Sequence, residues 1–361
     1  MLNTLLLAVS SLAVAADLGF DIMQSDASNI RQVAAIAGVS IATVSRTLQH
    51  PELVKAETRE KVLAAVRQTN FVSNAQARTF RQQATKAVIV LVRDIGNPFY
   101  LEIYKGIDEV AREAGFRVLL SDARDDDAQV QQHIEMVRQK QADGLILMVG
   151  HFPAELTEKI DQLPPLVIAS EAFPGLDLPT VKVDNAQASR QAIAYLVNEG
   201  HRRIVHLAGP LPEQLALERL EGYRAGLREA GISYNDKLVV PGDYSIEAGR
   251  SAVRRLREAD TEFSAIFAAS DQMAIGAISE LRRLGQKVPE DISVVGFDDI
   301  ILADAMDPPL TTIRQPRREI GRQAMSMMIA RLSGETARTV VELPTELVPR
   351  ESVRRARPLD S

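Results

Sequence analysis

Carboxylates and aromatic rings recur in this chain directly after short apolar runs of residues. They stand at Asp94, Phe99, Tyr100, Asp122, Asp184, Tyr244, Asp271 and Asp298. If the runs are parallel strands, these residues gather at the carboxyl edge of a sheet, where open parallel sheets bind their ligands. The pattern therefore predicts a small-molecule site, although packing at the sheet edge explains the adjacent rings of Phe99 and Tyr100 equally well.

No catalytic or metal-binding motif accompanies these residues. The sequence has no G-x-S-x-G, P-loop or dinucleotide-binding motif, and its five histidines show no H-E-x-x-H spacing. It has no cysteine, which excludes disulfides, zinc ribbons and thiol nucleophiles. The acidic stretch SDARDDDAQ lacks the Gly and Glu of a calcium loop and suits the start of a helix instead. The sequence predicts a binding protein, not an enzyme, with no cofactor and no metal.

Apolar, β-rich runs alternate with amphipathic helical stretches from residue 87 onward. Strands are expected at 87–92, 117–122, 144–149, 166–169 and 180–183, and then at 203–208, 238–240, 265–269 and 293–297. Helices are expected at 98–114, 127–140, 153–162, 185–199, 214–230, 245–258 and 271–284. Continuous apolar strands between amphipathic helices predict parallel sheets covered on both faces. Two such series predict two doubly wound α/β lobes that face each other across a cleft.

Charge is distributed unevenly along the chain, whose formal net charge is −6. Residues 29–86 contain nine Lys or Arg and three Glu, a net charge of +6, so the other residues together carry −12. A basic segment attached to an acidic body predicts a polyanionic partner that is bound by this segment alone. Random variation in surface charge is the alternative explanation.

The basic segment has the pattern of a helix-turn-helix. Residues 30–37 predict a short helix that Gly38 ends, and Ser40 is a suitable N-cap for a second helix at 41–48. A third helix is expected at 57–69. Their common core is expected to contain Val33, Ala34, Ala37, Val39, Val44, Leu48, Val62, Leu63 and Val66.

Because Val44 and Leu48 are expected to face the core, other residues of the second helix are expected to point outward. The outward residues are Ile41, Ala42, Ser45 and Arg46. Small side chains let a helix enter the major groove of DNA, where Arg46 can pair with guanine and Ser45 with a phosphate or base edge. An ordinary pair of packed helices shares this spacing, so the spacing alone does not decide between the two.

The first residues, which include NTLLLAVSSLAVAAD, resemble the apolar part of an export signal. No basic residue precedes this stretch, the first Lys or Arg is Arg31, and the stretch is too short to span a membrane. Export would also contradict a DNA-binding segment directly behind it. We therefore expect residues 1–28 to be a disordered tail or a mis-assigned leader, with Met23 as an alternative start.

A family resemblance joins these observations. IRQVAAIAGVSIATVSRTL and TREKVLAAVRQTNFVSNAQAR resemble the amino-terminal domain of LacI-family repressors. NPFYLEIYKGIDEVAREAGF, GHRRIVHLAGP, ASDQMAIGAI, VPEDISVVGFDDI and PLTTIRQP resemble later stretches of that family, in the expected order. The resemblance covers residue 29 onward. It implies an all-α DNA-binding domain followed by a bilobed effector domain like that of periplasmic binding proteins.

The resemblance implies a homodimer that binds a palindromic operator in double-stranded DNA. It places Ile41, Ala42 and Arg46 at base-contacting positions, and Thr43 and Ser45 at phosphate-contacting positions beside Ser40. Ile41 can make only apolar contacts, so Arg46 is expected to provide the hydrogen-bonded reading of sequence.

A hinge that enters the minor groove is implied at SNAQARTFR, residues 73–81. Phe80 stands where the family usually has a Leu wedge, and Arg81 follows it. Gln76 occupies a position that is often apolar, which departs from the family pattern. A helix this short is expected to order only on DNA or between two protomers.

The resemblance also implies which residues bind the effector. These are Phe99, Tyr100, Asp184, Arg219, Tyr244, Asp271 and Asp298. Carboxylates with a guanidinium suit the vicinal hydroxyls of a sugar or ribose, and aromatic rings suit a base or the apolar face of a sugar. DPPLTTIRQPRREIGRQAM and FPGLDLPTVKVDN are most similar to the cytidine-responsive branch of the family. Glu213 and Leu215 replace the Arg and Thr of the purine-binding branch, which argues against a purine.

The sequence therefore predicts a dimeric, cytoplasmic, nucleoid-associated repressor regulated by a nucleoside such as cytidine, or by a sugar, with no membrane contact. A second DNA-bound regulator is left open as a partner. The expected domains are 29–72 (helix-turn-helix), 73–85 (hinge), 86–184 with 314–333 (first lobe), and 185–313 with 334–361 (second lobe). An exported sugar- or nucleoside-binding protein with the same bilobed fold is the alternative.

Overall fold

The computed structural model describes residues 30–71, 84–124, 126–157, 160–211, 213–335 and 339–356. The predicted tail and the hinge residues Gln76, Phe80 and Arg81 lie outside the described residues. The chain divides into two units, Met1–Gln83 and Ala84–Ser361. Within the described residues, no helix is both long enough and apolar enough to cross a membrane.

The first unit is the predicted helix-turn-helix. Helical residues 30–37 are followed by α2 (Ile41–Gln49), a 3-10 turn (Pro51–Leu53) and α3 (Ala56–Thr69). Ser40 caps α2 as predicted, since its hydroxyl accepts a hydrogen bond from the Thr43 backbone amide. The buried core consists of Val33, Ala34, Ala37, Val44, Val62 and Ala65. Leu63 was assigned to this core wrongly: it is 36% exposed, because the inward positions of α3 are Val62 and Ala65.

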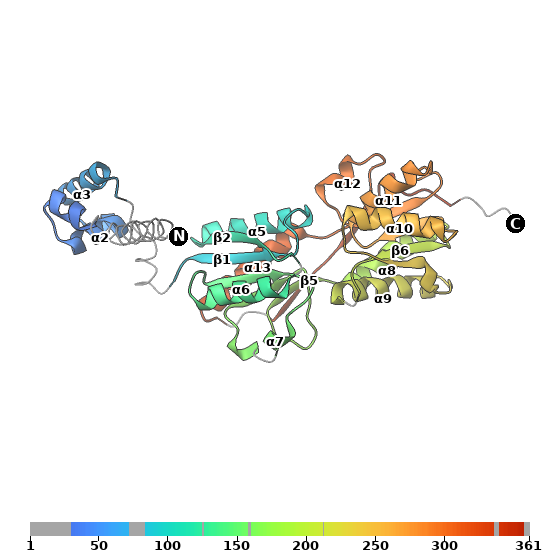
Figure 1. The fold of residues 1–361 in the computed structure, drawn as a ribbon, viewed down its shortest axis with the longest axis horizontal. Helices are drawn as coiled ribbons and strands as arrows, with labels where there is room; N and C mark the ends of the chain where they lie inside the picture. The colour runs from blue at the N-terminus through green and yellow to red at the C-terminus, as the bar shows by residue number, and fades with distance from the viewer. Residues whose placement is uncertain are drawn as a thin grey trace, which may run out of the picture. The chain divides into compact units, whose positions relative to one another are not determined.

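The second unit contains two six-stranded sheets (Figure 1). The sequence predicted the two sheets, but with five and four strands. The first has the order β11-β5-β4-β3-β1-β2 and all its pairs are parallel. Its strands are β1 (Ala87–Val92), β2 (Arg117–Asp122), β3 (Gly144–Met148), β4 (Leu166–Ala169), β5 (Thr180–Val183) and β11 (Val340–Leu343). The strands expected from sequence in this lobe agree with the observed ones to within one residue.

The second sheet has the order β12-β10-β9-β8-β6-β7. Its strands are β6 (Ile204–Ala208), β7 (Val239–Pro241), β8 (Ala265–Ala268), β9 (Ser293–Asp298), β10 (Thr311–Arg314) and β12 (Glu346–Val348). Only the β10–β12 pair is antiparallel; the other pairs are parallel. This edge strand makes the sheet mostly, rather than wholly, parallel.

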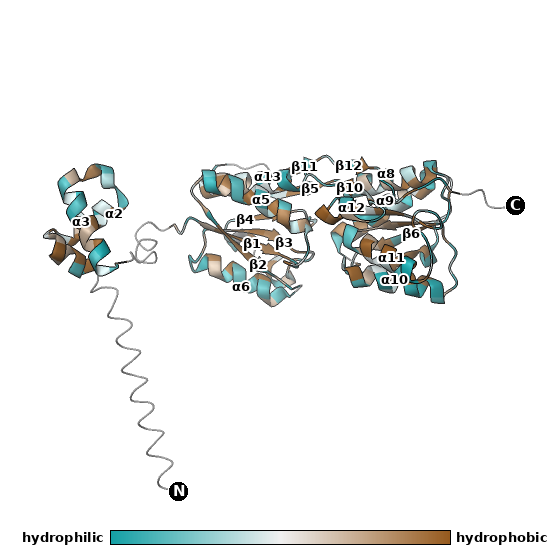
Figure 2. Ribbon diagram, turned by 90° about the horizontal axis from the view of Figure 1, so that it is seen from above, coloured by the Kyte–Doolittle hydropathy of each residue, from teal (hydrophilic) through white to brown (hydrophobic). Residues whose placement is uncertain are grey.

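Helices cover both faces of each sheet, and the strands between them are hydrophobic (Figure 2). In the first lobe, α5 (Phe99–Glu113) and α13 (Arg317–Leu332) pack on one face and α6 (Asp127–Arg138) on the other. In the second lobe, α10 (Ile246–Glu258) and α11 (Asp271–Arg283) lie opposite α8 (Asn185–Asn198) and α9 (Gln214–Glu229). The shorter elements are α7 (Ala154–Thr157), α12 (Ile301–Ala305) and 3-10 turns at Ile160–Gln162 and Asp236–Leu238. The first of these turns and α7 replace the single helix expected at 153–162.

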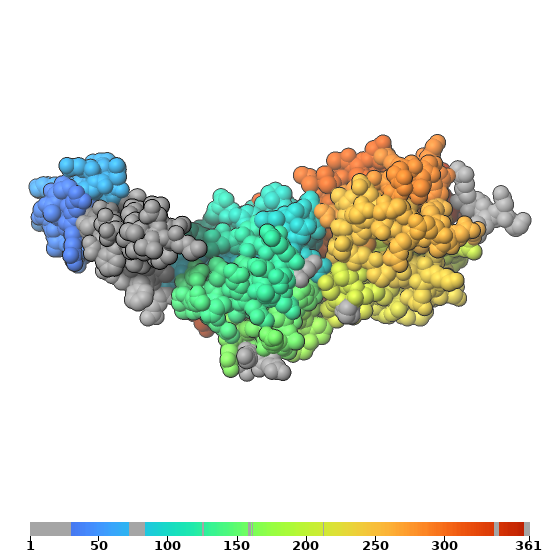
Figure 3. Space-filling view, in the orientation of Figure 1, coloured from blue at the N-terminus to red at the C-terminus, as the bar shows by residue number. Residues whose placement is uncertain are grey.

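The chain passes between the lobes three times. It crosses from β5 to α8, returns from β10 to α13, and crosses again from β11 to β12. The assignment of 334–361 to the second lobe is therefore corrected in part: β11 pairs with β5 in the first sheet from Val340 to Leu343, whereas β12 pairs with β10 in the second sheet as expected. The two lobes meet along one seam in the space-filling view (Figure 3).

Glycines let neighbouring helices approach closely on one face of the first sheet. A Cβ on Gly106 of α5 would overlap the carbonyl oxygen of Arg318 on α13, and a Cβ on Gly321 would overlap that of Ile103. Backbone atoms cannot move aside as a flexible side chain can. The α5–α13 contact therefore requires glycine at both positions.

Gly106→Ala is expected to lower the free energy of unfolding of the second unit by about 1–3 kcal/mol, since the added methyl overpacks the helix contact. Chemical denaturation gives this value. Ser326→Ala, at an exposed position of α13, serves as the control and should leave stability nearly unchanged. A Gly106→Ala protein as stable as the parent would show that the helices can separate without cost.

Candidate functional site

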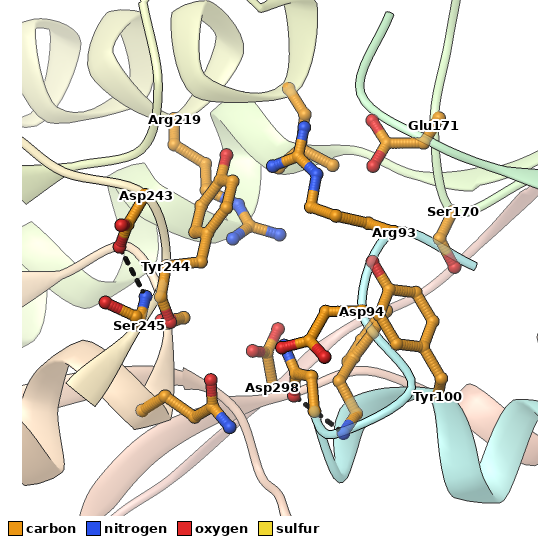
Figure 4. Close-up of a pocket in the computed structure, with 15 residues that line it drawn as sticks. Arg93, Asp94, Tyr100, Ser170, Glu171, Arg219, Asp243, Tyr244, Ser245 and Asp298 are labelled. Atoms are coloured by element: carbon orange, nitrogen blue, oxygen red, sulfur yellow. Dashed lines mark hydrogen bonds between the residues drawn. The ribbon is translucent and has the colours of Figure 1, made fainter. Parts of the chain in front are cut away.

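A cavity opens between the lobes at the carboxyl ends of their strands. It is lined by Arg93, Asp94, Asn97, Phe99, Tyr100, Ser170 and Glu171 from the first lobe, and by Leu215, Arg219, Asp243, Tyr244, Ser245, Ser270, Gln272 and Asp298 from the second. Figure 4 shows side chains from both lobes surrounding one open space.

Five of the seven residues expected to bind the effector line this cavity: Phe99, Tyr100, Arg219, Tyr244 and Asp298. The rings of Phe99 and Tyr100 lie edge to face, with their centroids 5.2 Å apart. Phe99 also packs in the core of the first lobe, so its ring both lines the cavity and has the packing role that the sequence left open.

The other two expected residues, Asp184 and Asp271, are not among the lining residues. Asp184 is exposed and caps α8, where its carboxylate accepts a hydrogen bond from the Gln187 amide. Asp271 is fully buried, and its carboxylate accepts hydrogen bonds from the Thr312 hydroxyl (2.6 Å) and the Ile300 amide (2.8 Å). Burial raises the pKa of Asp271, and the neighbouring charge of Asp298 raises it further. In this structure both carboxyls hold the fold together.

The second-lobe wall is built around Arg219. This side chain is 3% exposed and donates from Nε to Asn185 and from Nη1 to the carbonyl of Ala269. Its guanidinium lies 3.8 Å from the centroid of Phe297. These contacts fix the charge at the end of the strands, where it lines the cavity.

Asp298 lies at the end of β9 on the same wall. It is 6% exposed, and its carboxylate accepts a hydrogen bond from the Gln315 amide at 2.8 Å. Burial raises the pKa of Asp298 to about 6, although the positive charge of Arg219 opposes this shift. At neutral pH the carboxylate is mainly ionised and can accept hydrogen bonds from hydroxyl groups.

Tyr244 presents an aromatic surface and a polar end to the cavity. Its backbone has a φ of 67°, and its hydroxyl oxygen is buried without a hydrogen-bond partner among the described residues. Burial raises its pKa well above the ordinary value, so the phenol stays protonated. The hydroxyl can therefore both donate to and accept from a bound molecule.

The first-lobe wall contains an ion pair that the sequence did not predict. Arg93 follows β1 and Glu213 precedes α9, so the pair joins the two lobes, with 2.5 Å between Nη2 and Oε1. A Cβ on Gly150 would overlap the ends of both side chains, which would then have to shift. Burial alone would lower the pKa of Arg93, but the hydrogen bond with Glu213 and the charge of Glu171 raise it.

Ser170 and Glu171 follow β4 directly on the same wall. Ser170 is 6% exposed and its hydroxyl has no hydrogen-bond partner among the described residues. Burial raises the pKa of Glu171 to about 8, and the positive charge of Arg93 opposes the shift. These residues and Arg93 follow strands that the sequence predicted, so the strand-end rule would have found them had it included serine, glutamate and arginine.

The proposed DNA-reading face of α2 is exposed. Ile41 is 43% exposed, Ala42 and Arg46 are also exposed, and Ser45 is partly exposed. The hydroxyl of Thr43 lies 2.9 Å from that of Ser40. The side chains that the sequence predicted to point outward from this helix are therefore exposed or partly exposed.

Two protein-family models together match nearly the whole chain from residue 29 onward. The family model described as "Bacterial regulatory proteins, lacI family" matches residues 29–74. The model described as "Periplasmic binding proteins and sugar binding domain of LacI family" matches residues 85–350.

Individual proteins give the same result. The HTH-type transcriptional repressor CytR of Escherichia coli (strain K12) is 40% identical over 86% of this chain and 92% of its own length. The ribose operon repressor of the same strain is 34% identical over 85% of this chain and 94% of its own. The structure of the lac repressor dimer bound to operator and the anti-inducer ONPF has a TM-score of 0.78 at 28% identity, over 89% of this chain and 98% of that one.

Arg46→Ala is expected to weaken binding to a specific duplex by about 1–3 kcal/mol and to relax the preference at one base pair per half-site. The duplex is selected from a randomised pool by the full chain, and affinity is measured by fluorescence anisotropy. Arg67→Ala, an exposed arginine on α3, controls for the loss of charge. If Arg46→Ala weakened specific and random duplexes equally, Arg46 would be a phosphate contact instead.

Proposed function

Since this chain belongs to the LacI family and is a DNA-binding transcriptional repressor with an effector-binding domain, we propose that it acts as a dimer on a palindromic operator and that its effector is a nucleoside such as cytidine. The family is not enzymatic. A repressor of this kind works where the chromosome is, so the proposal includes a cytoplasmic location.

The single observation that carries the effector proposal is the composition of the cavity. Arg219 and the Asp298 carboxylate supply the donors and acceptors that ribose hydroxyls require. Tyr100, Tyr244 and Leu215 supply an aromatic and apolar surface of the kind that a base requires. A free sugar needs the polar groups more than the aromatic and apolar surface. The presence of both therefore favours a nucleoside. The similarity of residues 307–325 and 173–185 to the cytidine-responsive branch supports the same choice.

Regulation follows from the position of the cavity between two lobes. A ligand that contacts both lobes stabilises one relative arrangement of them. The segment that leads to the DNA-binding unit is held by the first lobe, because Asp143 accepts hydrogen bonds from the amides of Thr85 (2.7 Å) and Lys86 (2.8 Å). A change in the relative arrangement of the lobes therefore also moves the start of the hinge segment.

Exposed apolar residues on the second unit suit dimerisation. Leu119 and Leu120 lie on β2, an edge strand of the first sheet, and are 42% and 39% exposed. Leu101 of α5 and Ile301 of α12 are 48% and 73% exposed. An exposed apolar edge strand is a site for association with another chain. The proposed occupant is a second copy of this protein.

The alternative of an exported binding protein is not supported. Residues 29–74 match the DNA-binding family model, and this segment would have no use in a secreted solute-binding protein.

The full chain is expected to bind a palindromic duplex with an affinity that falls about 10³-fold when the salt concentration rises about fourfold. A chain that starts at Ala84 should not bind it, and a duplex with one half-site should bind the full chain much more weakly. Anisotropy titrations at several salt concentrations measure all three. Equal binding by the full and shortened chains would exclude the proposed operator-binding role.

Cytidine is expected to raise the melting temperature of the full chain by about 5–10 °C at about 100 times its Kd. It should change operator affinity, and operator should change cytidine affinity by the same factor. Asp298→Asn should abolish the thermal shift. Asp184→Asn, outside the cavity and with capping preserved, should retain it. A shift with hexoses or ribose but with no nucleoside would exclude a nucleoside effector.

A further inference from the structure

We propose that the carboxyl of Glu171 recognises the 4-amino group of a cytosine base, and so selects cytidine against nucleosides without an amino group at that position. This inference rests on the proposed nucleoside effector and assigns a residue to the discrimination between bases.

Glu171 lies in the cavity wall beside a guanidinium that already has a carboxylate partner. Arg93 pairs with Glu213 at 2.5 Å, and both side chains are held over Gly150. Glu171 is thus a second carboxyl next to one guanidinium, at a wall where a bound ligand can reach it. Extra hydrogen-bond acceptors at this wall favour a ligand edge that carries N–H donors.

The neighbouring Ser170 indicates independently that a polar ligand edge belongs here. Its hydroxyl is buried and lines the cavity, yet it has no hydrogen-bond partner among the described residues. Buried polar groups in folded proteins nearly always have a partner. A base edge seated against Ser170 and Glu171 supplies one.

The protonation of Glu171 fits cytosine. Burial raises the pKa of Glu171 to about 8, with Arg93 opposing the shift, so a proton is mainly present at neutral pH. A protonated carboxyl offers one acceptor and one donor side by side. The 4-amino group and N3 of cytosine present a donor and an acceptor side by side, so two hydrogen bonds form together.

The ribose of the nucleoside lies at a different part of the cavity from the base. Asp298 lies on the second-lobe wall, and Figure 4 shows it well separated from Glu171 across the open space. A ribose at Asp298 and a base at Glu171 use the two ends of one nucleoside. Tyr244 lines the second-lobe side of the same open space and offers its ring to the base.

The test compares cytidine with pyrimidin-2-one ribonucleoside, which is cytidine without its 4-amino group. Isothermal titration calorimetry on the full chain gives Kd for each ligand. The parent protein should bind cytidine at least about tenfold more tightly. Glu171→Met, which keeps the length of the side chain but removes the carboxyl, should bind both ligands with Kd values within about twofold of each other.

Asp243→Asn is the matched control. Asp243 is another carboxylate of the same cavity, and its oxygen accepts a hydrogen bond from the Ser245 amide, which asparagine preserves (2.9 Å, Figure 4). This variant should retain the preference for cytidine. Cooperative thermal unfolding checks each variant, and Glu171→Ala replaces Glu171→Met if the latter does not fold.

Two results would overturn the inference and leave the proposed function standing: equal binding of the two nucleosides by the parent, or an undiminished preference in the folded Glu171 variant. Binding of ribose or a hexose by a parent protein that binds neither nucleoside would instead exclude the proposed effector class, and this inference with it.

Discussion

The ion pair between Arg93 and Glu213 is the interaction on which the cavity depends. It joins a residue that follows β1 in one lobe to a residue that precedes α9 in the other, and both side chains are largely buried. Removing one partner would leave the other as an uncompensated buried charge, which is strongly unfavourable. The pair therefore sets how the two walls face each other, and Glu171, Ser170 and Tyr244 are positioned around it.

Much of this fold follows from patterns that the sequence displays openly. Strands such as β1 and β3 are buried on both faces, so they are continuous apolar runs, and the helices between them are amphipathic. β11 and β12 were not predicted, because they are short and partly exposed, and each contains a glutamate beside its apolar residues. Their pairing depends on strands far away in the sequence. This is why the residues of β11 were assigned to the wrong lobe.

The site could be predicted only in part, for a different reason. The strand-end rule locates a residue at the correct edge of the sheet but does not determine where its side chain points. Asp271 satisfies the rule, yet its carboxylate turns inward to Thr312 and Ile300. Arg93 and Glu171 satisfy it as well, but a search limited to aspartates and aromatic rings passed over them. Which charged groups share one cavity is decided by tertiary packing, and sequence spacing does not contain that information.

The three passages of the chain between the lobes limit how the lobes can move. One link would leave the lobes free to swivel in many directions, whereas three separate links restrict such motion and favour hinge closure. The close α5–α13 contact at Gly106 and Gly321 keeps the first lobe stiff during such a rotation. Any molecule that contacts both walls then changes the same quantity, the angle between the two lobes, whatever the chemistry of the molecule. The same scaffold can therefore acquire a new effector through changes in the cavity wall, while its mechanical output stays the same.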